Sequence, residues 1–157
     1  MNATRRARQD DVAAMSRVLM ASINELCIAD HGNEARKLAA WTRNKSVEGV
    51  GAMLANPDFE MHVAERDGEV IAVGAVTSDG TIALNYVAPW ARFSGVSTMM
   101  LNTLEVALIA MGHKEARLES TRTAMEFYTR RGWVVAGPQA TGRVVNGFPM
   151  IKTLNAD

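Results

Sequence analysis

The chain has 157 residues, of which 48% are hydrophobic and 22% are charged, and this is enough to build a real hydrophobic core in a globular fold. Lys and Arg (17) balance Asp and Glu (17), so the formal net charge of zero argues against broad binding to nucleic acid or to an acidic membrane surface, while a local basic pocket stays compatible with it. The one cysteine, Cys27, excludes an internal disulfide framework.

The N-terminal residues and the hydrophobic runs bear on where the protein works. Met1 to Asp10 lack the apolar run of a signal peptide, and no apolar run approaches the ~20 residues needed to span a bilayer. A single cysteine fits a reducing compartment. We therefore expect a cytoplasmic protein with one domain, residues 1–157, and no membrane contact.

The N-terminal third predicts a short strand followed by helices. Thr4 to Arg8 can form the strand, and Asp10 and Asp11 offer N-cap chemistry for the helix that follows. His31-Gly32-Asn33 ends this stretch. The helix has a buried stripe of residues at helical spacing, namely Val12, Met15, Val18, Leu19, Ser22, Ile23 and Leu26.

The middle of the chain predicts two helical pieces and an antiparallel meander. Glu34 to Ala55 is helical, with a weak point at Ser46, and Asn56-Pro57-Asp58 forms a turn. Asp-Gly pairs separate the apolar runs that follow, which is a strong hairpin signal. The predicted strands are Glu60 to Glu65, Val70 to Thr77 and Thr81 to Val87.

The C-terminal half alternates helices and strands. A long helix is expected from Gly95 to Met111, with Gly112 as its C-terminal stop. After it we predict a strand at Ala116–Glu119, a helix at Thr121–Arg131, a strand at Trp133–Ala136 and a last strand near Val144–Leu154. The element order predicts an α/β (α+β) fold with a mixed, mostly antiparallel central sheet flanked by helices.

The stretch from Leu84 to Ser97 is the most informative part of the sequence. A strand-like run ends before Pro89, an arginine and a glycine follow at Arg92 and Gly95, and a long helix then begins. This order places free backbone N–H groups at the N-terminus of a helix, where a glycine lets a ligand approach the main chain. Such a site suits an anion, and a pyrophosphate in particular.

Two motifs resemble the GNAT superfamily of acetyl-CoA-dependent N-acetyltransferases. Arg92-Phe93-Ser94-Gly95-Val96-Ser97 is similar to the acyl-CoA loop of that family, in which Gln or Arg is followed by two residues, Gly, one residue, and Gly or Ala. Ser97 departs from the last position, and Thr121 stands where many members carry an asparagine that contacts the cofactor. The family also has a later pattern, in which an alanine is followed by an apolar residue with a tyrosine and then by a glycine with an aromatic residue. The chain matches this pattern at Ala124, Phe127, Tyr128, Gly132 and Trp133.

The resemblance implies a GNAT-like acyl-CoA N-acyltransferase fold and a transfer reaction. Acetyl-CoA would be the acyl-donor cosubstrate, with no metal, and a primary amine of a small molecule or peptide would attack it directly in a ternary complex. A backbone N–H near Tyr86 or Val87 would stabilise the oxyanion, and Tyr128 would donate to the departing thiolate. The implied cofactor-binding residues are Leu84, Asn85, Tyr86, Val87, Arg92, Phe93, Ser94, Gly95, Val96, Ser97, Thr121 and Tyr128.

The residue that deprotonates the amine is open in the sequence. Glu25, Asp30 and His31 cluster at the end of the first helical region, where one of them can be a base or an ammonium anchor; Glu25 and His31 are the candidates we name as catalytic. The alternative is a solvated helix end, with a water chain carrying the proton. Cys27 as an acyl-carrying nucleophile is less favoured than Cys27 as a small buried apolar residue.

Other readings of the same residues stay open. A protein of this fold can bind acyl-CoA as a sensor and catalyse nothing, and Tyr128 argues mildly against this. A nucleotide phosphate loop is disfavoured, because the chain lacks both the Gly-Lys-Ser/Thr ending and the three-glycine dinucleotide spacing. The Cys and His residues show no metal-ligand spacing beyond the pair Cys27 and His31. We expect an amine substrate as the partner, no nucleic acid, and a possible homodimer.

Overall fold

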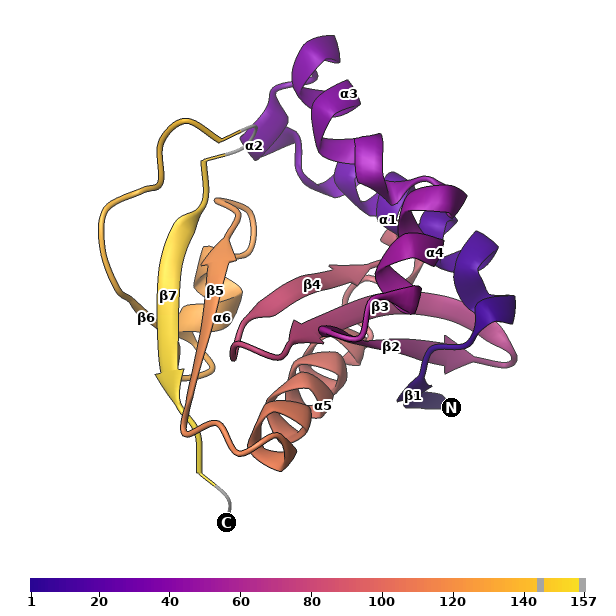
Figure 1. The fold of residues 1–157 in the computed structure, drawn as a ribbon. Coiled ribbons are helices and arrows are strands. Elements are labelled where there is room, and N and C mark those ends of the chain that lie inside the picture. Colours follow the sequence, from indigo (N-terminus) through magenta and orange to yellow (C-terminus); the bar gives the residue numbers. More distant parts are fainter. Residues whose placement is uncertain (144–145, 156–157) are drawn as a thin grey trace.

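The computed structural model describes residues 1–143 and 146–155, and two antiparallel sheets form its framework (Figure 1). One sheet has the order β1-β2-β3-β4, with β1 Asn2–Arg6, β2 Phe59–Arg66, β3 Glu69–Thr77 and β4 Ile82–Val87. The other has the order β5-β7-β6, with β5 Glu115–Ser120, β6 Val134–Val135 and β7 Phe148–Thr153. A single parallel bridge between Thr81 and Arg117 joins them, so the sheets meet at one end of β4 and β5 and diverge beyond it.

The meander predicted from the Asp-Gly pairs is confirmed. β2 and β3 pair antiparallel around Asp67 and Gly68, whose φ angles of 52° and 80° are those of a tight hairpin turn. β3 lies between β2 and β4 and is buried along nearly its whole length. Gly74 in β3 lets a helix pack closely, because a Cβ there would lie 2.7 Å from Sδ of Met100.

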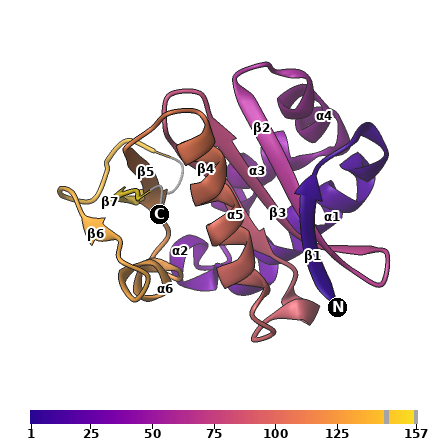
Figure 2. The same ribbon diagram turned by 90° about the horizontal axis from the view of Figure 1, so that it is seen from below.

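Helices cover both faces of the first sheet (Figures 1 and 2). α1 and α4 pack on one face and α5 on the other, with Met15, Leu19, Val73 and Met100 among the fully buried core side chains. Within residues 1–143 and 146–155, no helix has the length and apolar character needed to cross a membrane. The helices are α1 Val12–Leu26, α2 Ile28–His31, α3 Ala35–Thr42, α4 Val47–Ala55, α5 Val96–Ala110 and α6 Met125–Thr129.

The start of the chain differs from the prediction in detail. The first strand is Asn2–Arg6 rather than Thr4–Arg8, because the chain must turn into the 3-10 helix Gln9–Asp11 before α1 begins. Asp11 does not cap α1 with its side chain. Its carboxylate instead accepts hydrogen bonds from the guanidinium of Arg5 (2.8 and 2.9 Å) and from the Arg8 N–H (2.7 Å).

The C-terminal half contains two further differences. The helix expected at Thr121–Arg131 is shorter, since only α6 Met125–Thr129 is helical and the residues before it form turns. The last strand is β7, and residues 144–145 of the predicted strand lie outside the described residues. The expected central sheet is present but divided, because β4 and β5 part after their bridge, and this division creates the cavity described next.

Candidate functional site

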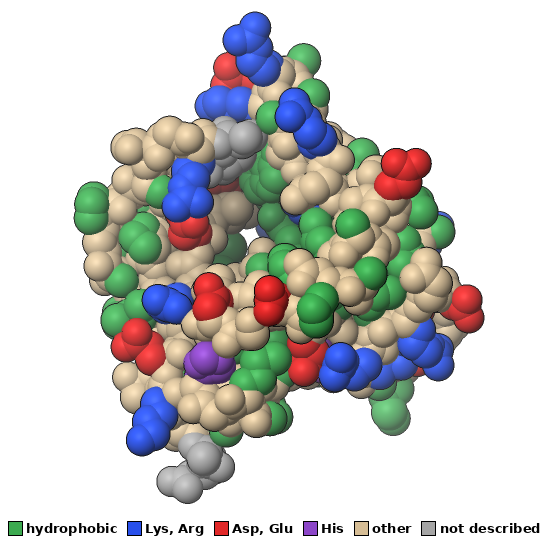
Figure 3. Space-filling model, in the orientation of Figure 1, with side chains coloured by type: hydrophobic (Ala, Val, Ile, Leu, Met, Phe, Trp, Pro, Cys, Tyr) green, Lys and Arg blue, Asp and Glu red, His purple; other side chains and the backbone are tan. Residues whose placement is uncertain are grey.

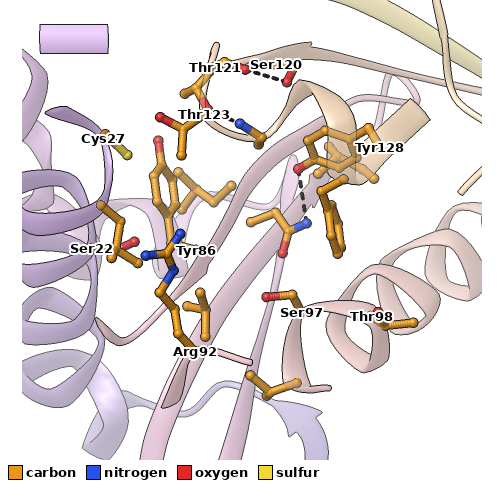
Figure 4. A pocket seen from close by; sticks show the side chains of 18 of the residues that line it. Ser22, Cys27, Tyr86, Arg92, Ser97, Thr98, Ser120, Thr121, Thr123 and Tyr128 are labelled. Atoms are coloured by element: carbon orange, nitrogen blue, oxygen red, sulfur yellow. Dashed lines mark hydrogen bonds between the residues drawn. The ribbon is translucent and has the colours of Figure 1, made fainter. Parts of the chain in front are cut away.

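A cavity of about 400 Å³ lies where the two sheets diverge, and the space-filling view shows the molecule hollowed there (Figure 3). Its walls come from both halves of the chain: α1, β4, the loop before α5, the first turn of α5, β5 and α6 (Figure 4). All twelve residues that the sequence predicts as cofactor-binding line it. They are Leu84, Asn85, Tyr86, Val87, Arg92, Phe93, Ser94, Gly95, Val96, Ser97, Thr121 and Tyr128.

The first turn of α5 presents unpaired donors to this cavity. Gly95 is the N-cap residue, with φ of 81°, and the first bond of the helix runs from the Met99 N–H to the Gly95 carbonyl (3.2 Å). The N–H groups of the first turn, at residues 96–98, therefore have no carbonyl in a preceding turn. A Cβ on Gly95 would meet no atom within 4 Å, so the backbone is open to a ligand. Together with the helix dipole, this geometry suits a phosphate or diphosphate.

The edge of β4 offers a second set of backbone groups. The Ala88 N–H donates to the Ile71 carbonyl on β3 (2.8 Å). Neighbouring residues of an antiparallel strand point their N–H groups to opposite sides, so Tyr86 also faces β3 whereas Asn85 and Val87 face the gap toward β5. Of the two oxyanion donors expected from the sequence, Val87 is the one whose N–H points to the cavity side.

Tyr128 of α6 projects a phenol into the same cavity. Its side chain is buried, with 5% of the residue exposed, and packs edge-on against Phe127 and Trp133. The Asn85 amide nitrogen donates a hydrogen bond to the Tyr128 hydroxyl oxygen (3.0 Å; Figure 4). Burial raises the pKa of Tyr128 to about 12. The hydroxyl is therefore protonated at neutral pH, and its own hydrogen is free for another acceptor.

A second phenol, Tyr86, faces the α1 side of the cavity (Figure 4). The indole N–H of Trp41 in α3 donates to its hydroxyl oxygen (3.3 Å). Burial raises the pKa of Tyr86 above its usual value, so this phenol is uncharged as well.

Two arginines give the cavity positive charge. Arg92 lies in the loop before α5, with its guanidinium 4.8 Å from the ring centroid of Phe93, a residue that is 93% exposed and has φ of 61°. Arg131 follows α6; it stacks 3.8 Å above the Phe127 ring and donates to Oγ1 of Thr98 over 2.8 and 3.1 Å. The guanidinium of Arg131 thus lies at the N-terminal turn of α5, whereas that of Arg92 is turned toward Tyr86 and Ser22 (Figure 4).

Sequence reasoning missed Arg131 as a member of this site. Its position in the last helical turn predicted a partner of the helix C-terminus, and Nη1 does donate to the Phe127 carbonyl (2.9 Å). Its contact with Thr98 spans 33 residues, so no local pattern could have indicated it. The Thr121 hydroxyl is likewise engaged locally, accepting a hydrogen bond from the Ala124 N–H (3.2 Å).

The structure does not bring Glu25 or His31 to the cavity. Glu25 is exposed on α1. His31 is fully buried, and both ring nitrogens are occupied: Nε2–H donates to the Ile23 carbonyl (2.8 Å), and Nδ1 accepts from the Asn33 N–H (3.0 Å). Asp30 binds the turn before α6, accepting from the Thr123 hydroxyl (2.7 Å). These bonds give His31 and Asp30 structural partners, and Glu25 lies at the surface outside the cavity.

Cys27 does line the cavity, at the end of α1. Burial raises the pKa of its thiol to about 12, so it is present as a thiol rather than a nucleophilic thiolate. Among the residues that the structure describes, no three His, Cys, Asp or Glu side chains form a group able to hold a metal ion.

Comparisons with known proteins place this geometry in context. Residues 27–154 match the family model of the acetyltransferase (GNAT) domain. No curated protein matches the chain. A GCN5-related N-acetyltransferase from Rhodopseudomonas palustris superposes with a TM-score of 0.86 at 23% identity, covering 98% of this chain and 96% of that one.

Two further similar structures contain coenzyme A. PaiA N-acetyltransferase from Thermoplasma acidophilum, solved with coenzyme A, has a TM-score of 0.79 at 19% identity over 98% of this chain and 99% of its own. An aminoglycoside 6'-N-acetyltransferase complexed with coenzyme A has a TM-score of 0.74 at 16% identity over 99% and 98%. At these identities the likeness establishes the fold alone.

Proposed function

The chain belongs to the GNAT family of acetyltransferases, and from this premise we propose that it transfers an acetyl group from acetyl-CoA to a primary amine of a small molecule or peptide, by direct attack in a ternary complex. One observation carries the proposal. A single cavity joins the open N–H groups of the first turn of α5, the free edge of β4 and the hydroxyl of Tyr128. An acyl-CoA needs these three features: an anion site, an extended edge and a donor near its sulfur.

Acetyl-CoA fits the residues present. The diphosphate would lie at the first turn of α5, where backbone N–H groups and the guanidinium of Arg131 provide donors and positive charge. Arg92, in the loop before α5, lines the same cavity (Figure 4) and would reach the diphosphate by a change of its side-chain rotamer. The pantetheine arm has amide groups that can pair with the open edge of β4, as an added strand would. That two similar structures were solved with coenzyme A supports the assignment.

The reaction exchanges a carbon–sulfur bond for a carbon–nitrogen bond. A neutral amine nitrogen attacks the acetyl carbonyl carbon, negative charge develops on the carbonyl oxygen, and the sulfur leaves as the nitrogen loses a proton. The Val87 N–H is the donor that we assign to the developing oxyanion. One such donor is commonly worth about 3 to 4 kcal/mol of transition-state stabilisation.

Tyr128 is the group that we assign to the departing sulfur. Its pKa of about 12 is well above the usual thiol value of about 8.5, so complete proton transfer from Tyr128 to a thiolate is uphill. The phenol therefore acts mainly as a hydrogen-bond donor to the sulfur as charge develops there. The proton that the nitrogen loses can then neutralise the thiolate.

No side chain that we predicted as a base faces the cavity with a free acceptor, so we propose that solvent removes the proton from the amine. Hydroxyl groups of Ser22, Ser120 and Thr121 line the cavity and can order water molecules. In this proposal, ordered water takes the role of proton acceptor that the sequence assigned to Glu25 or His31. It also requires that the attacking amine already be neutral for an appreciable fraction of the time.

Thiol release with acetyl-CoA and a panel of amines tests the function, with mass spectrometry of the acetylated amine as confirmation. The proposal expects thiol release that depends on the amine and falls strongly in the variant Tyr128→Phe. Binding of acetyl-CoA without turnover of any amine would contradict the proposal and favour the sensor function. A cytoplasmic location and a homodimer stay predictions from the sequence.

A further inference from the structure

The helix that carries Tyr128 is too short to hold its own direction. α6 has only 5 residues, Met125–Thr129, whereas isolated helices need about 12 to 15 residues to be even marginally stable in water. The Tyr128 N–H donates to the Ala124 carbonyl (3.2 Å), so the turn at residues 121–124 is the base from which this helix rises. The position of the phenol therefore depends on what holds that turn.

A carboxylate from the N-terminal part of the chain holds this turn. Asp30 on α2 accepts hydrogen bonds from the backbone N–H groups of Arg122 and Thr123 (2.5 and 3.2 Å) and from the Thr123 hydroxyl (2.7 Å). The two backbone bonds span 92 and 93 residues. Hydrogen bonds that a carboxylate accepts are shorter and stronger than those between neutral groups. Asp30 thus anchors the turn on which α6 begins.

The anchor is itself fixed to the α1 wall of the cavity. The next residue, His31, is fully buried, and its ring bonds the Ile23 carbonyl of α1 (2.8 Å) and the Asn33 N–H (3.0 Å). The short helix α2 is therefore held against the end of α1. Through Asp30, the wall formed by α1 is joined to the wall formed by α6. Figure 4 shows Thr123, the residue that Asp30 binds, on the side of the cavity between Cys27 and Tyr128.

Among the residues that the structure describes, three sets of side-chain hydrogen bonds join residues 121–131 to the part of the chain before β5. Asn85 on β4 donates to the phenol (3.0 Å), and Arg131 donates to Thr98 on α5 (2.8 and 3.1 Å). The third set is that of Asp30. The first two act on α6 and just beyond its C-terminal end, whereas Asp30 acts before its N-terminal end. Asp30 therefore controls the tilt of α6 relative to β4.

From this arrangement we infer that Asp30 is a positioning residue for acetyl transfer, which acts through Tyr128; the inference rests on the proposed function. Asp30 itself does not line the cavity. Without its hydrogen bonds the start of α6 is free to move, and the phenol leaves the place where charge develops on the sulfur. A displacement of about 1 Å at a reacting centre can cost about 10²-fold in rate, even when its origin is remote.

Single variants test the role of the anchor. Asp30→Ala should lower kcat of acetyl-CoA-dependent thiol release about tenfold and leave the KM for acetyl-CoA within about twofold. Asp30→Asn keeps an oxygen that accepts from the turn, so its kcat should stay within about threefold of the parent. Asp11→Ala is the matched control, because Asp11 also accepts three hydrogen bonds but lies before α1 and outside the cavity. It should lower stability and leave kcat unchanged.

A double variant separates positioning from direct action on the amine. The kcat of Asp30→Ala/Tyr128→Phe should equal that of Tyr128→Phe within about twofold, because displacement of a ring without its hydroxyl costs nothing more. If Asp30 acted on the amine as a base or an anchor, the two losses would multiply, and Asp30→Asn would be as slow as Asp30→Ala. Either result would overturn the inference while leaving the proposed function intact.

The side-chain amide of Asn85 reports the place of the phenol without any turnover, because it donates to the Tyr128 hydroxyl. Its proton and nitrogen resonances in NMR should move in Asp30→Ala toward their positions in Tyr128→Phe, and should stay in place in Asp11→Ala. Unmoved resonances in Asp30→Ala would overturn the inference, whether or not the protein acetylates an amine. Absence of amine-dependent thiol release from the parent, with acetyl-CoA bound, would overturn the proposed function, and the resonances would still decide whether Asp30 orients Tyr128.

Discussion

The amide nitrogen of Asn85 on β4 donates a hydrogen bond of 3.0 Å to the hydroxyl oxygen of Tyr128 on α6, across the cavity between the two sheets. This bond joins the strand that we assign to the thioester with the helix that we assign to the leaving sulfur. Because Asn85 is the donor, the phenol keeps its own hydrogen for a ligand. The bond therefore orients Tyr128 without consuming the proton on which its proposed role depends.

Removal of the Tyr128 hydroxyl should separate catalysis from binding. We expect Tyr128→Phe to lower kcat by about 10²-fold, since one positioned hydrogen-bond donor to developing charge commonly contributes at least that much, and to leave the Kd of acetyl-CoA nearly unchanged. The variant should also lose about 1 to 3 kcal/mol of stability, because the buried Asn85 amide loses its acceptor. Thiol-release assays measure kcat, titration calorimetry measures the Kd, and urea unfolding measures the stability. An unchanged kcat would remove Tyr128 from the mechanism.

Alkaline pH should destabilise the protein through the same side chain. The pKa of Tyr128 is about 12 in the folded protein against about 10 in an unfolded chain, so between these values the folded state holds a proton that the unfolded state has lost. The stabilisation is complete below pH 10 and is lost as the pH rises toward 12, at about 1.4 kcal/mol per pH unit. Urea unfolding from pH 9 to 11 should show a shallower decline for Tyr128→Phe than for the parent, because Cys27 and Tyr86 are present in both. Parallel declines would contradict the shifted pKa.

Gly95 should be required for the ligand rather than for the fold. A valine there finds space, but its positive φ of 81° imposes strain of about 1 to 2 kcal/mol, and its side chain would cover the open N–H groups of α5. Gly112 at the other end of α5 is a matched control, because its φ is 94° and a Cβ there would likewise meet no atom within 4 Å. We expect both Gly95→Val and Gly112→Val to lower the melting temperature similarly, and only Gly95→Val to abolish binding of coenzyme A in calorimetry. Equal affinities would refute the loop assignment.

Arg131 should matter for coenzyme A, and its neighbour Arg130 should not. Arg131 lines the cavity and donates to Thr98 in the first turn of α5, whereas Arg130 is exposed and pairs with Glu126. We expect Arg131→Ala to raise the Kd of coenzyme A about tenfold, or about 1.4 kcal/mol, and to weaken its salt dependence. Arg130→Ala should change neither quantity. Matching losses in the two variants would indicate a general effect of charge rather than a contact.

Local sequence patterns predicted most of the fold because its elements have strong local signals. The hairpin at Asp67-Gly68 and the start of α5 at Gly95 need backbone angles that glycine favours, and both lie where predicted. The shortened α6 was missed because its start depends on Asp30, which binds residues 122 and 123 from more than 90 positions away. The division of the sheet was missed for a similar reason. It depends on β4 and β5 meeting only near the bridge between Thr81 and Arg117, which are distant in the sequence.

In the candidate site, too, local patterns predicted some residues and missed others. The residues around Gly95 and Tyr128 were predicted because they follow short motifs, and they line one cavity. His31 was misjudged because its sequence context shows a histidine near a helix end, whereas its burial against Trp41 and the occupation of both nitrogens arise only in the packed structure. The contact of Arg131 with Thr98 depends equally on long-range packing.

The backbone amides of residues 95–98 give the most direct test, since they are the donors that we assign to the diphosphate. Their proton and nitrogen resonances can be followed by NMR during titration with coenzyme A, and in parallel with pantetheine, which lacks the diphosphate. The structure predicts the largest downfield shifts at Val96, Ser97 and Thr98 with coenzyme A, and only small shifts there with pantetheine. Shifts confined to other parts of the chain, or equal shifts with both ligands, would contradict the assignment.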